Sequence, residues 1–241
     1  MIISYKSFNI FIYVNLFLLS LSYLTHFYNY YIITSFVRNC ALTLFIYHGT
    51  KNKKEISKQP KKSYYTQDYL YLVSSSVLQS SSELFIKVGF NVNGLFLLRL
   101  LLFEILLDLF HYTFHRFSHV QFYKFHKTHH HHNHPSVLNT FYHHPVDLIL
   151  LECIPTLISF YLIPFSKLEI SIVLVYKSFI EISGHSGKQV KSGSFPLCVW
   201  LPKFLGISLY TQNHDKHHSD NNCNYSKRFS LWDKIFGTFK D

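Results

Sequence analysis

The sequence has little charge and few of the residues that mark several common protein classes. Only 15% of its 241 residues are charged, and alanine occurs once, at Ala41. Its four cysteines, Cys40, Cys153, Cys198 and Cys223, lie far apart and form no CxxC pair. This spacing indicates neither a disulfide framework nor a thiolate metal site, and it fits a reducing compartment.

Acidic residues are also scarce, with 13 Asp and Glu against 23 Lys and Arg, which gives a net charge of +10. Such a charge can indicate nucleic-acid binding, but the chain has no basic helix and no aromatic RNA-binding signature. The lysines concentrate instead in KNKKEISKQPKK, residues 51–62, between apolar stretches. We therefore predict a cytoplasmic loop that is attracted to anionic lipid headgroups, and no nucleic-acid partner.

Apolar residues are abundant and occur in long runs near the N-terminus. Residues 8–25 and 30–47 are each close to the roughly 20 residues that span a bilayer. A cleaved signal peptide is the alternative for the first run, but no small-residue cleavage site follows it. Arg38 interrupts the second run. The N-terminal region is therefore predicted to contain two membrane spans.

Four further apolar segments follow. Residues 69–90 are serine-rich and predict a poor span or an interfacial helix, whereas residues 95–114 predict a strong helix. Residues 146–163 and 168–183 form a pair joined at Pro164. The chain is thus predicted to be an all-α, integral-membrane helical bundle with about four to six spans.

The 17 histidines follow a spacing that indicates metal binding. The chain contains one HxxxH box and two HxxHH boxes, and spacings of three and four residues place side chains on one face of a helix. The boxes supply eight imidazoles, from His115, His119, His126, His129, His130, His214, His217 and His218.

Two more candidate ligands lie between the boxes, His185 in EISGHSG and His144 in HHP. A structural zinc ion takes four ligands, so eight to ten imidazoles fit two metal ions better than one. Because imidazole suits Zn, Cu, Fe and Ni, the ligand type alone does not identify the metal.

Ionisable side chains near the second half of the 95–114 segment are candidates for function, because charge inside a membrane helix is costly. Asp108, Tyr112 and His115 follow at spacings of four and three residues. A carboxylate close to a ligating histidine commonly accepts its second N–H. We predict this role for Asp108, and also for Asp147 and Asp215. Asp108, Tyr112 and Asp215 are the predicted catalytic residues.

The remaining histidines of the central tract have simpler interpretations. His131, His132 and His134 are predicted to be solvated surplus in a low-complexity run. For His111 and His143 the sequence leaves two alternatives open, which are support of a ligand and ordinary packing.

These motifs, taken in order, resemble the fatty acid hydroxylase/sterol desaturase superfamily of integral-membrane di-iron oxygenases. The resemblance covers more than half of the chain. It rests on D-x3-Y-x2-H-R-x2-H at Asp108–His119, H-x2-H-H at His126–His130, HP-x-[E/D] at His144–Asp147, the HSG histidine His185, and H-D-x-H-H with trailing N-Y and L-W-D-x-x-F-G-T at His214–Thr238.

The resemblance implies a helical membrane bundle with a cytosolic, histidine-rich metal-binding cap, usually in the endoplasmic reticulum. It also implies a di-iron centre that uses O2 to oxidise a membrane lipid, with electrons from cytochrome b5 or an equivalent carrier supplied by NAD(P)H. Residues 91–241 would form the catalytic domain, and residues 1–90 the N-terminal spans with the basic loop. Because no fused cytochrome b5 domain precedes the first span, the carrier is expected to be separate.

The substrate is less sharply indicated. The run NCNYSKRFSLWDKIFGT is most similar to the sterol branch, which includes C-4 methylsterol oxidase-like, cholesterol 25-hydroxylase-like and C-5 desaturase-like members. The alternative is a fatty acid or sphingoid-base hydroxylase, which shares most of the same marks. The boxes do not separate hydroxylation from desaturation, because both use the same ligands.

Some residues depart from the family pattern. Gln189 lies one turn after His185, where some members have another histidine, and Ser226 stands where NYG-type members have glycine. The glutamine at position 189 leaves the number of ligands open. An alternative from another class is a non-catalytic membrane protein that binds or transports divalent metal ions through its histidines.

Overall fold

The computed structural model describes most of the chain, namely residues 5–27, 31–57, 66–89, 94–190 and 194–241. Within these ranges the chain is helical, and its β-structure is limited to isolated bridges. The predicted all-α fold is therefore confirmed. The longer helices are α1 (Tyr5–Phe27), α2 (Tyr31–Thr50), α3 (Thr66–Glu83), α4 (Phe96–Gln121), α8 (Lys167–Gly184) and α10 (Thr211–Asp220).

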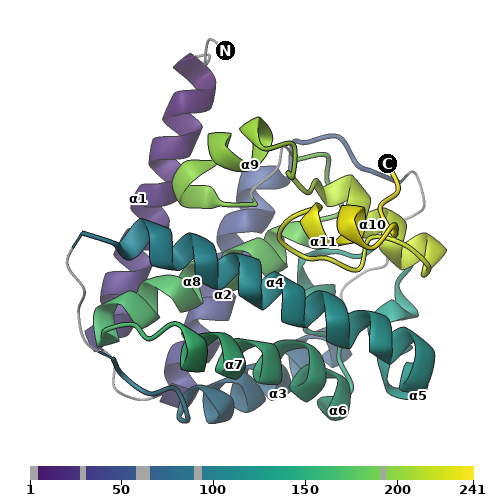
Figure 1. Cartoon of the computed structure of the whole chain (residues 1–241), viewed down its shortest axis with the longest axis horizontal. Helices are drawn as coiled ribbons and strands as arrows, with labels where there is room; N and C mark the ends of the chain where they lie inside the picture. Colours follow the sequence, from purple (N-terminus) through teal and green to yellow (C-terminus); the bar gives the residue numbers. More distant parts are fainter. Residues whose placement is uncertain (1–4, 28–30, 58–65, 90–93, 191–193) are drawn as a thin grey trace.

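Shorter elements connect these helices and carry much of the histidine tract (Figure 1). Short α-helices are α5 (Tyr123–His126), α6 (Pro145–Leu148), α7 (Ile154–Leu162), α9 (Trp200–Phe204) and α11 (Leu231–Ile235). Single-turn 3₁₀ elements are η1 (His129–His131), η2 (Val137–Phe141) and η4 (Pro196–Cys198), and a π-helical turn, η3 (Ile149–Cys153), joins α6 to α7.

Helix α1 packs against α8 and ties the N-terminal region to the rest of the molecule. The Tyr176 hydroxyl donates to Asn15 Oδ1 at 2.8 Å, and Asn15 Nδ2 donates to the Pro196 carbonyl at 3.0 Å. Leu18 and Val175 belong to the same buried apolar cluster. A polar side chain on an apolar helix is thus satisfied inside the bundle, as burial of amide groups requires.

Arg38, which interrupts the second apolar run, is buried between α2 and α3. Its guanidinium pairs with the Glu83 carboxylate at 2.5 Å and donates to the Ser35 hydroxyl at 3.2 Å. A charge inside an apolar helix is costly unless it has a partner, and Glu83 provides that partner from the last turn of α3. The ion pair explains how the sequence tolerates Arg38.

The segment 69–90, predicted to be a poor span or an interfacial helix, is only partly helical in the structure. Helix α3 ends at Glu83, and Gly89 then donates its N–H to the Phe165 carbonyl at 2.8 Å. The helix has only 18 residues, and three of its serine side chains, those of Ser75, Ser76 and Ser80, are buried. The chain leaves the helix where Glu83 is held by Arg38, so residues 84–89 do not extend it.

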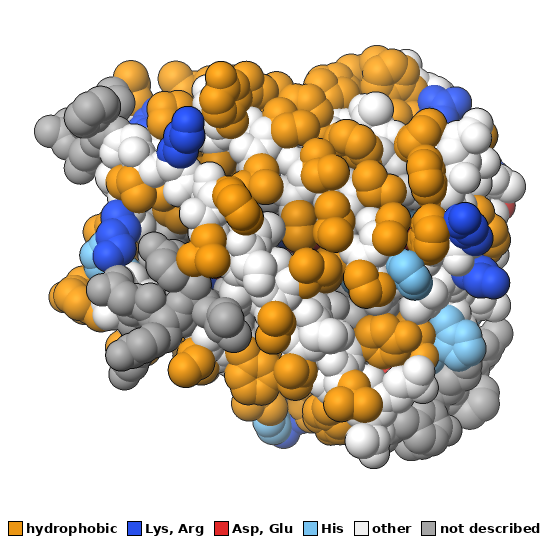
Figure 2. Space-filling view, turned by 90° about the horizontal axis from the view of Figure 1, so that it is seen from below, with side chains coloured by type: hydrophobic (Ala, Val, Ile, Leu, Met, Phe, Trp, Pro, Cys, Tyr) orange, Lys and Arg blue, Asp and Glu red, His pale blue; other side chains and the backbone are white. Residues whose placement is uncertain are grey.

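Two helical stretches among the described residues have the length and apolar composition of a membrane span, Ser7–Phe27 and Pro145–Leu162. The predicted total of four to six spans remains a prediction. Figure 2 shows an apolar face of the molecule on which Lys and Arg side chains lie mainly toward the margin. Large apolar side chains are exposed on and beside several helices, among them Tyr161 of α7 (77%) and Phe85 just after α3 (76%), as expected for contact with lipid.

The described part of the lysine loop lies beside the segment that follows His185. Lys188 Nζ pairs with the Glu55 carboxylate at 3.1 Å, and Gln189 donates its N–H to the Lys54 carbonyl at 2.8 Å. The loop and the end of α8 are therefore on the same side of the molecule. This is the arrangement that a shared cytosolic location for the loop and the histidines would require.

Candidate metal centre

The fold brings nine of the ten predicted ligands into two neighbouring histidine groups. In each group one ligand atom per residue can be chosen so that all lie within 4.8 Å of one another. The first group consists of His115, His119, His126, His130 and His217, and the second of His129, His185, His214 and His218. We refer to them as the first and second histidine groups.

Each group takes histidines from elements that are distant in the sequence. Helix α4 supplies His115 and His119, from its last two turns, to the first group, while α8 supplies the residue after its C-terminus, His185, to the second. The segment α5–η1 and helix α10 each contribute to both groups. On α10, His214 and His218 belong to the second group, and His217, three residues after His214, belongs to the first.

In the first group, ring nitrogens face one another as they do around an ion. His115 Nε2 lies 3.1 Å from His126 Nε2, and His217 Nε2 lies 3.1 Å from His130 Nε2. Two imidazoles bound to one ion at about 2.1 Å have nitrogens roughly 3.0–3.4 Å apart. The nitrogen of His119 that faces inward, Nε2, is buried without a hydrogen-bond partner. This donor set fits a metal ion.

The second group has the same pattern. His185 Nε2 lies 3.0 Å from His214 Nε2 and 3.3 Å from His129 Nε2. Both ring nitrogens of His218 are buried without a hydrogen-bond partner. Because buried polar atoms are otherwise almost always paired, an ion between these rings would satisfy atoms that the protein leaves unpaired.

The outward nitrogens of several rings are held by oxygen acceptors, which fixes the ring orientation and leaves Nε2 free to bind metal. Most acceptors are backbone carbonyls, and one is a carboxylate. The pairs are His115 Nδ1 with Tyr225 O (2.8 Å), His217 Nδ1 with Cys223 O (2.6 Å), His185 Nδ1 with Glu181 O (2.8 Å), and His126 Nδ1 with Asp147 Oδ1 (2.8 Å).

Burial keeps these imidazoles neutral. It lowers the pKa of His217 to about 3, with the other histidines of the cluster acting in the same direction. Burial, followed by the neighbouring His143 and His218, lowers the pKa of His129 well below its usual value. A neutral imidazole is the form that binds metal, so the rings are prepared for an ion at neutral pH.

His144, the tenth predicted ligand, lies outside both groups. Its Nδ1 atom accepts a hydrogen bond from the Val146 N–H at 3.2 Å, so the side chain caps the N-terminus of helix α6. The preceding residue, His143, is buried and stacks on His129 with a centroid distance of 4.2 Å. His143 also donates to Asp147 Oδ2 at 2.9 Å. His143 is therefore a support of a ligand, one of the two alternatives left open by the sequence.

Asp108 has a different role from the predicted one. Its carboxylate accepts the backbone N–H groups of residues 227–229, at 2.8, 2.9 and 3.1 Å. The Nδ1–H group of His115, on the same helix, donates to the Tyr225 carbonyl and not to Asp108. Asp108 therefore anchors the loop that carries this carbonyl and acts on the histidine only through the loop. The reason is that Asp108 faces the returning C-terminal segment, which the local sequence does not reveal.

Asp215 and Tyr112 also contact residues other than those predicted. Asp215 Oδ2 lies 2.8 Å from His134 Nδ1. The Tyr112 hydroxyl lies 3.1 Å from Thr238 Oγ1 and accepts from the Arg116 guanidinium at 3.1 Å. His134, predicted to be surplus, thus connects the histidine tract to α10. Among the described contacts, the hydrogen bonds of Asp215 and Tyr112 go to residues outside both histidine groups.

Asp233, which the sequence interpretation passed over, organises the end of the site. Its carboxylate accepts the backbone N–H groups of Tyr225 and Ser226, at 2.8 and 2.9 Å, and the Thr238 hydroxyl at 2.7 Å. The Tyr225 ring then lies against three rings of the first group, those of His115, His119 and His217. The aspartate of the trailing Leu-Trp-Asp motif was the signal that could have identified this role.

Comparison with known proteins places this site in a family. The sequence profile of the family described as fatty acid hydroxylase matches residues 100–238. The fatty acid hydroxylase vlmA of a Lecanicillium species is 31% identical over 151 residues, which cover 58% of this chain and 41% of vlmA. The C-4 methylsterol oxidase erg25 of Schizosaccharomyces pombe is 32% identical over 144 residues, covering 57% of this chain and 45% of erg25.

Sphinganine C4-monooxygenase 1 of Arabidopsis thaliana is 28% identical over 146 residues, covering 56% of this chain and 51% of that protein. This chain spans about half or less of the length of these curated relatives. No solved structure matches it. The profile match covers more than half of the chain and contains every residue of both histidine groups. The chain belongs to the fatty acid hydroxylase family.

Proposed function

We propose that this protein is an O2-dependent di-iron oxygenase that hydroxylates or desaturates a membrane lipid. The observation that supports this proposal most strongly is the pair of buried histidine groups. They lie side by side, with the ring centroids of His130 and His218 4.8 Å apart. Five neutral imidazoles would hold one iron ion, and four would hold the other.

When bound, two iron ions supply the O2 reduction by which an unactivated C–H bond is oxidised. Hydroxylation consumes one O2, two electrons and two protons, and yields an alcohol and one water. Desaturation consumes the same reactants and yields an alkene and two waters. The electrons would come from a separate carrier, such as cytochrome b5 reduced with NAD(P)H.

The residues of the chain would hold and shield the ions. The Asp147 carboxylate orients the His126 ring by accepting a hydrogen bond from the Nδ1 atom of that ring, and the Tyr225 carbonyl orients His115 in the same way. Exposed apolar side chains cover the helices around the centre, so a lipid could approach from the bilayer. A dry approach to the centre would also prevent side reactions with water.

Among the lipid classes, a sterol is the proposed substrate, because the C-terminal motif run is most similar to the sterol branch. The relatives include proteins named C-4 methylsterol oxidase and cholesterol 25-hydroxylase. A fatty acyl chain or a sphingoid base is the alternative, since vlmA is named a fatty acid hydroxylase. We propose residence in the endoplasmic reticulum membrane with the histidine groups facing the cytosol.

The proposed centre is tested by iron content and by paired variants. Purified, iron-loaded protein is expected to contain about two irons per chain. His217→Ala in the first group and His129→Ala in the second should each lower the iron content and abolish lipid oxidation, while membrane insertion is retained. His144→Ala is the matched control, because His144 lies outside both groups and should keep both properties.

Lipid oxidation that survives both ligand substitutions would contradict the proposal. Wild-type protein that holds only exchangeable zinc and consumes no O2 would identify a metal-binding or transport protein instead.

A further inference from the structure

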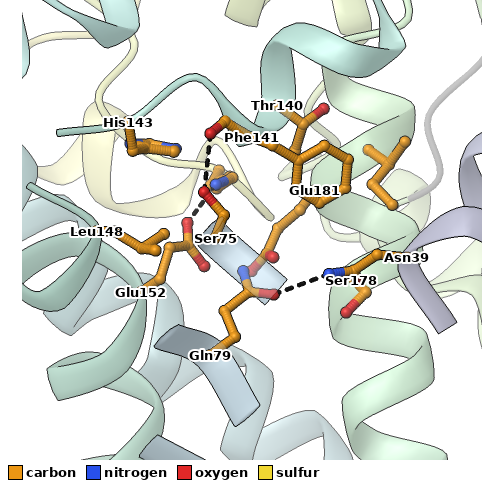
Figure 3. A pocket seen from close by; sticks show the side chains of 12 residues that line it. Asn39, Ser75, Gln79, Thr140, Phe141, His143, Leu148, Glu152, Ser178 and Glu181 are labelled. Carbon is orange, nitrogen blue, oxygen red and sulfur yellow. Dashed lines mark hydrogen bonds and ion pairs between the residues drawn. The ribbon is translucent and has the colours of Figure 1, made fainter. Parts of the chain in front are cut away.

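Two small polar cavities lie between α2, α3, η3 and α8. Each has a volume of about 10 Å³, which is room for about one water molecule. Gln79, Glu152 and Ser178 line both cavities, so the two share a wall. Figure 3 shows these side chains meeting around the first cavity, together with His143.

Glu152 pairs with two lysine side chains and so links the two cavities. One carboxylate oxygen pairs with Lys177 Nζ at 2.8 Å, and the other with Lys227 Nζ at 2.5 Å. Lys227 lines the first cavity, Lys177 lines the second, and Glu152 lines both. An ammonium–carboxylate–ammonium chain thus runs from one cavity to the other.

The bridge belongs to a larger buried ion network. Lys177 also pairs with Glu181 at 2.7 Å, and Arg228 pairs with Glu181 at 3.1 Å and with Glu104 at 2.5 Å. All of these side chains are buried. Removing ions from water costs several kcal/mol per ion, and such groups within membrane proteins often mark proton or ion pathways. Each end of the Lys177–Glu152–Lys227 bridge lies at one of the two water-sized cavities.

The second cavity contains polar atoms that lack a protein partner. Thr156 Oγ1 and Arg38 Nε are buried without a hydrogen-bond partner, and both residues line this cavity. Water is the small molecule that both satisfies such atoms and fits this volume. Glu83, at the end of α3, also lines this cavity, and the two residues that follow it, Leu84 and Phe85, are exposed.

The first cavity reaches the histidine centre. His143 lines it and stacks on His129 of the second group, with centroids 4.2 Å apart. The polar path therefore extends from the end of α3, through Glu152, to the edge of the candidate metal centre.

We propose that the two cavities hold water and that the Lys177–Glu152–Lys227 bridge conveys protons along this path to the centre. The inference rests on the proposed function, because the reduction of one O2 there consumes two protons per turnover. Lys227 releases a proton to water in the first cavity, and Glu152 restores it with a proton taken from Lys177. Lys177 is then reprotonated from water in the second cavity, so the charge of the bridge is unchanged after each transfer.

The central test is Glu152→Gln, which keeps the shape of the side chain but does not carry a proton. It should lower kcat by about tenfold or more, within the usual range for loss of an acid–base group. The KM for lipid and the iron content should be unchanged, and the solvent deuterium isotope effect on kcat should rise. Glu169→Gln is the matched control, since Glu169 is also buried and paired, with Arg99, but lines neither cavity.

If Glu152→Gln does not fold, Thr156→Val removes a polar group from the second cavity without removing a charge. It should also lower kcat and raise the isotope effect. An isotope effect in active protein that neither variant changes relative to wild type and Glu169→Gln would overturn the relay.

A second measurement needs neither iron nor lipid turnover. Hydroxyl-radical footprinting modifies side chains beside bound water, so Cys153 and Phe141, which line the cavities, should be modified although they are buried. Phe103 and Phe229, which are also buried but line neither cavity, should be protected. Equal protection of all four would show dry cavities and refute the relay, whereas wild type without lipid oxidation would contradict only the proposed function.

Discussion

Asp147 is the carboxylate with the most direct influence on the histidine centre. It accepts Nδ1–H from His126 of the first group and from His143, which stacks on His129 of the second group. One side chain therefore orients rings that support both groups. A partner of this kind commonly changes metal affinity when it is lost.

Asp147→Asn should lower metal affinity about 10- to 100-fold, because an amide is a weaker acceptor and its NH2 group faces ring N–H donors. The measurement is metal retained during dialysis against a graded chelator. Asp220→Asn is the control, since its carboxylate pairs with Lys240 at 2.9 Å, outside both groups. Equal loss of metal in the two variants would show that the orientation of His126 is unimportant.

At this scale, the sequence predicted ligands better than their partners. Spacings of three and four residues identified eight of the nine grouped histidines, because helix geometry alone places such residues together, and the HSG motif identified His185. The sequence did not show which of His143 and His144 faces the histidine centre, since adjacent residues in an extended segment point to opposite sides. The role of Asp108 depends on residues 227–229, which only the tertiary fold brings to it.

At the scale of elements, the turn after α8 connects His185 to the histidine tract. Gly187 has a φ of +64°, and a Cβ atom there would lie 2.6 Å from the Pro135 carbonyl oxygen. Pro135 follows His134, which holds α10 through Asp215. The glycine therefore permits the close approach of two segments that position the second histidine group.

Gly187→Ala should destabilise the protein by about 1–3 kcal/mol, because alanine is strained at this φ and its Cβ would displace Pro135. Metal bound by the second group should fall with it. Gly184→Ala is the control in the same motif, since no atom lies within 4 Å of its added Cβ and alanine favours a helix by about 1 kcal/mol over glycine. Thermal unfolding and metal content check both, and equal stability of the two variants would contradict the packing argument.

Helix boundaries were predicted less well than helix existence. All six apolar segments contain helices, because long apolar runs leave few alternatives. Helix α3 ends early at Glu83 and α4 continues to Gln121. These ends are set by the pairing of Glu83 with Arg38 and by the packing of His115 and His119 in the first group, and neither is a local property of the sequence.

For the whole molecule, the burial of so many neutral imidazoles makes the metal-free protein sensitive to acid. An unfolded histidine has a pKa of about 6.5, whereas burial lowers the pKa of His217 to about 3 and that of His129 well below its usual value. Above pH 6.5 both states are neutral, so these rings contribute no pH dependence. Below it, the unfolded state binds protons that the folded state does not, and stability falls as pH falls toward 3.

We therefore expect the metal-free protein to lose protease resistance in the part of the chain that carries the histidine groups between pH 7.5 and 5.5. Limited proteolysis followed by peptide mass spectrometry measures this. Resistance that is the same at both pH values would show that the imidazoles are not buried in the neutral form.

The central claim is that the two histidine groups serve the oxidation of a membrane lipid. Comparative lipid mass spectrometry of membranes that express wild type or His129→Ala tests it most directly. A wild-type product heavier than its parent lipid by one oxygen atom, or lighter by two hydrogen atoms, is predicted, and His129→Ala should lack it. The parent lipid then names the substrate. Identical lipid profiles from wild-type, iron-loaded membranes and from the variant would contradict the claim.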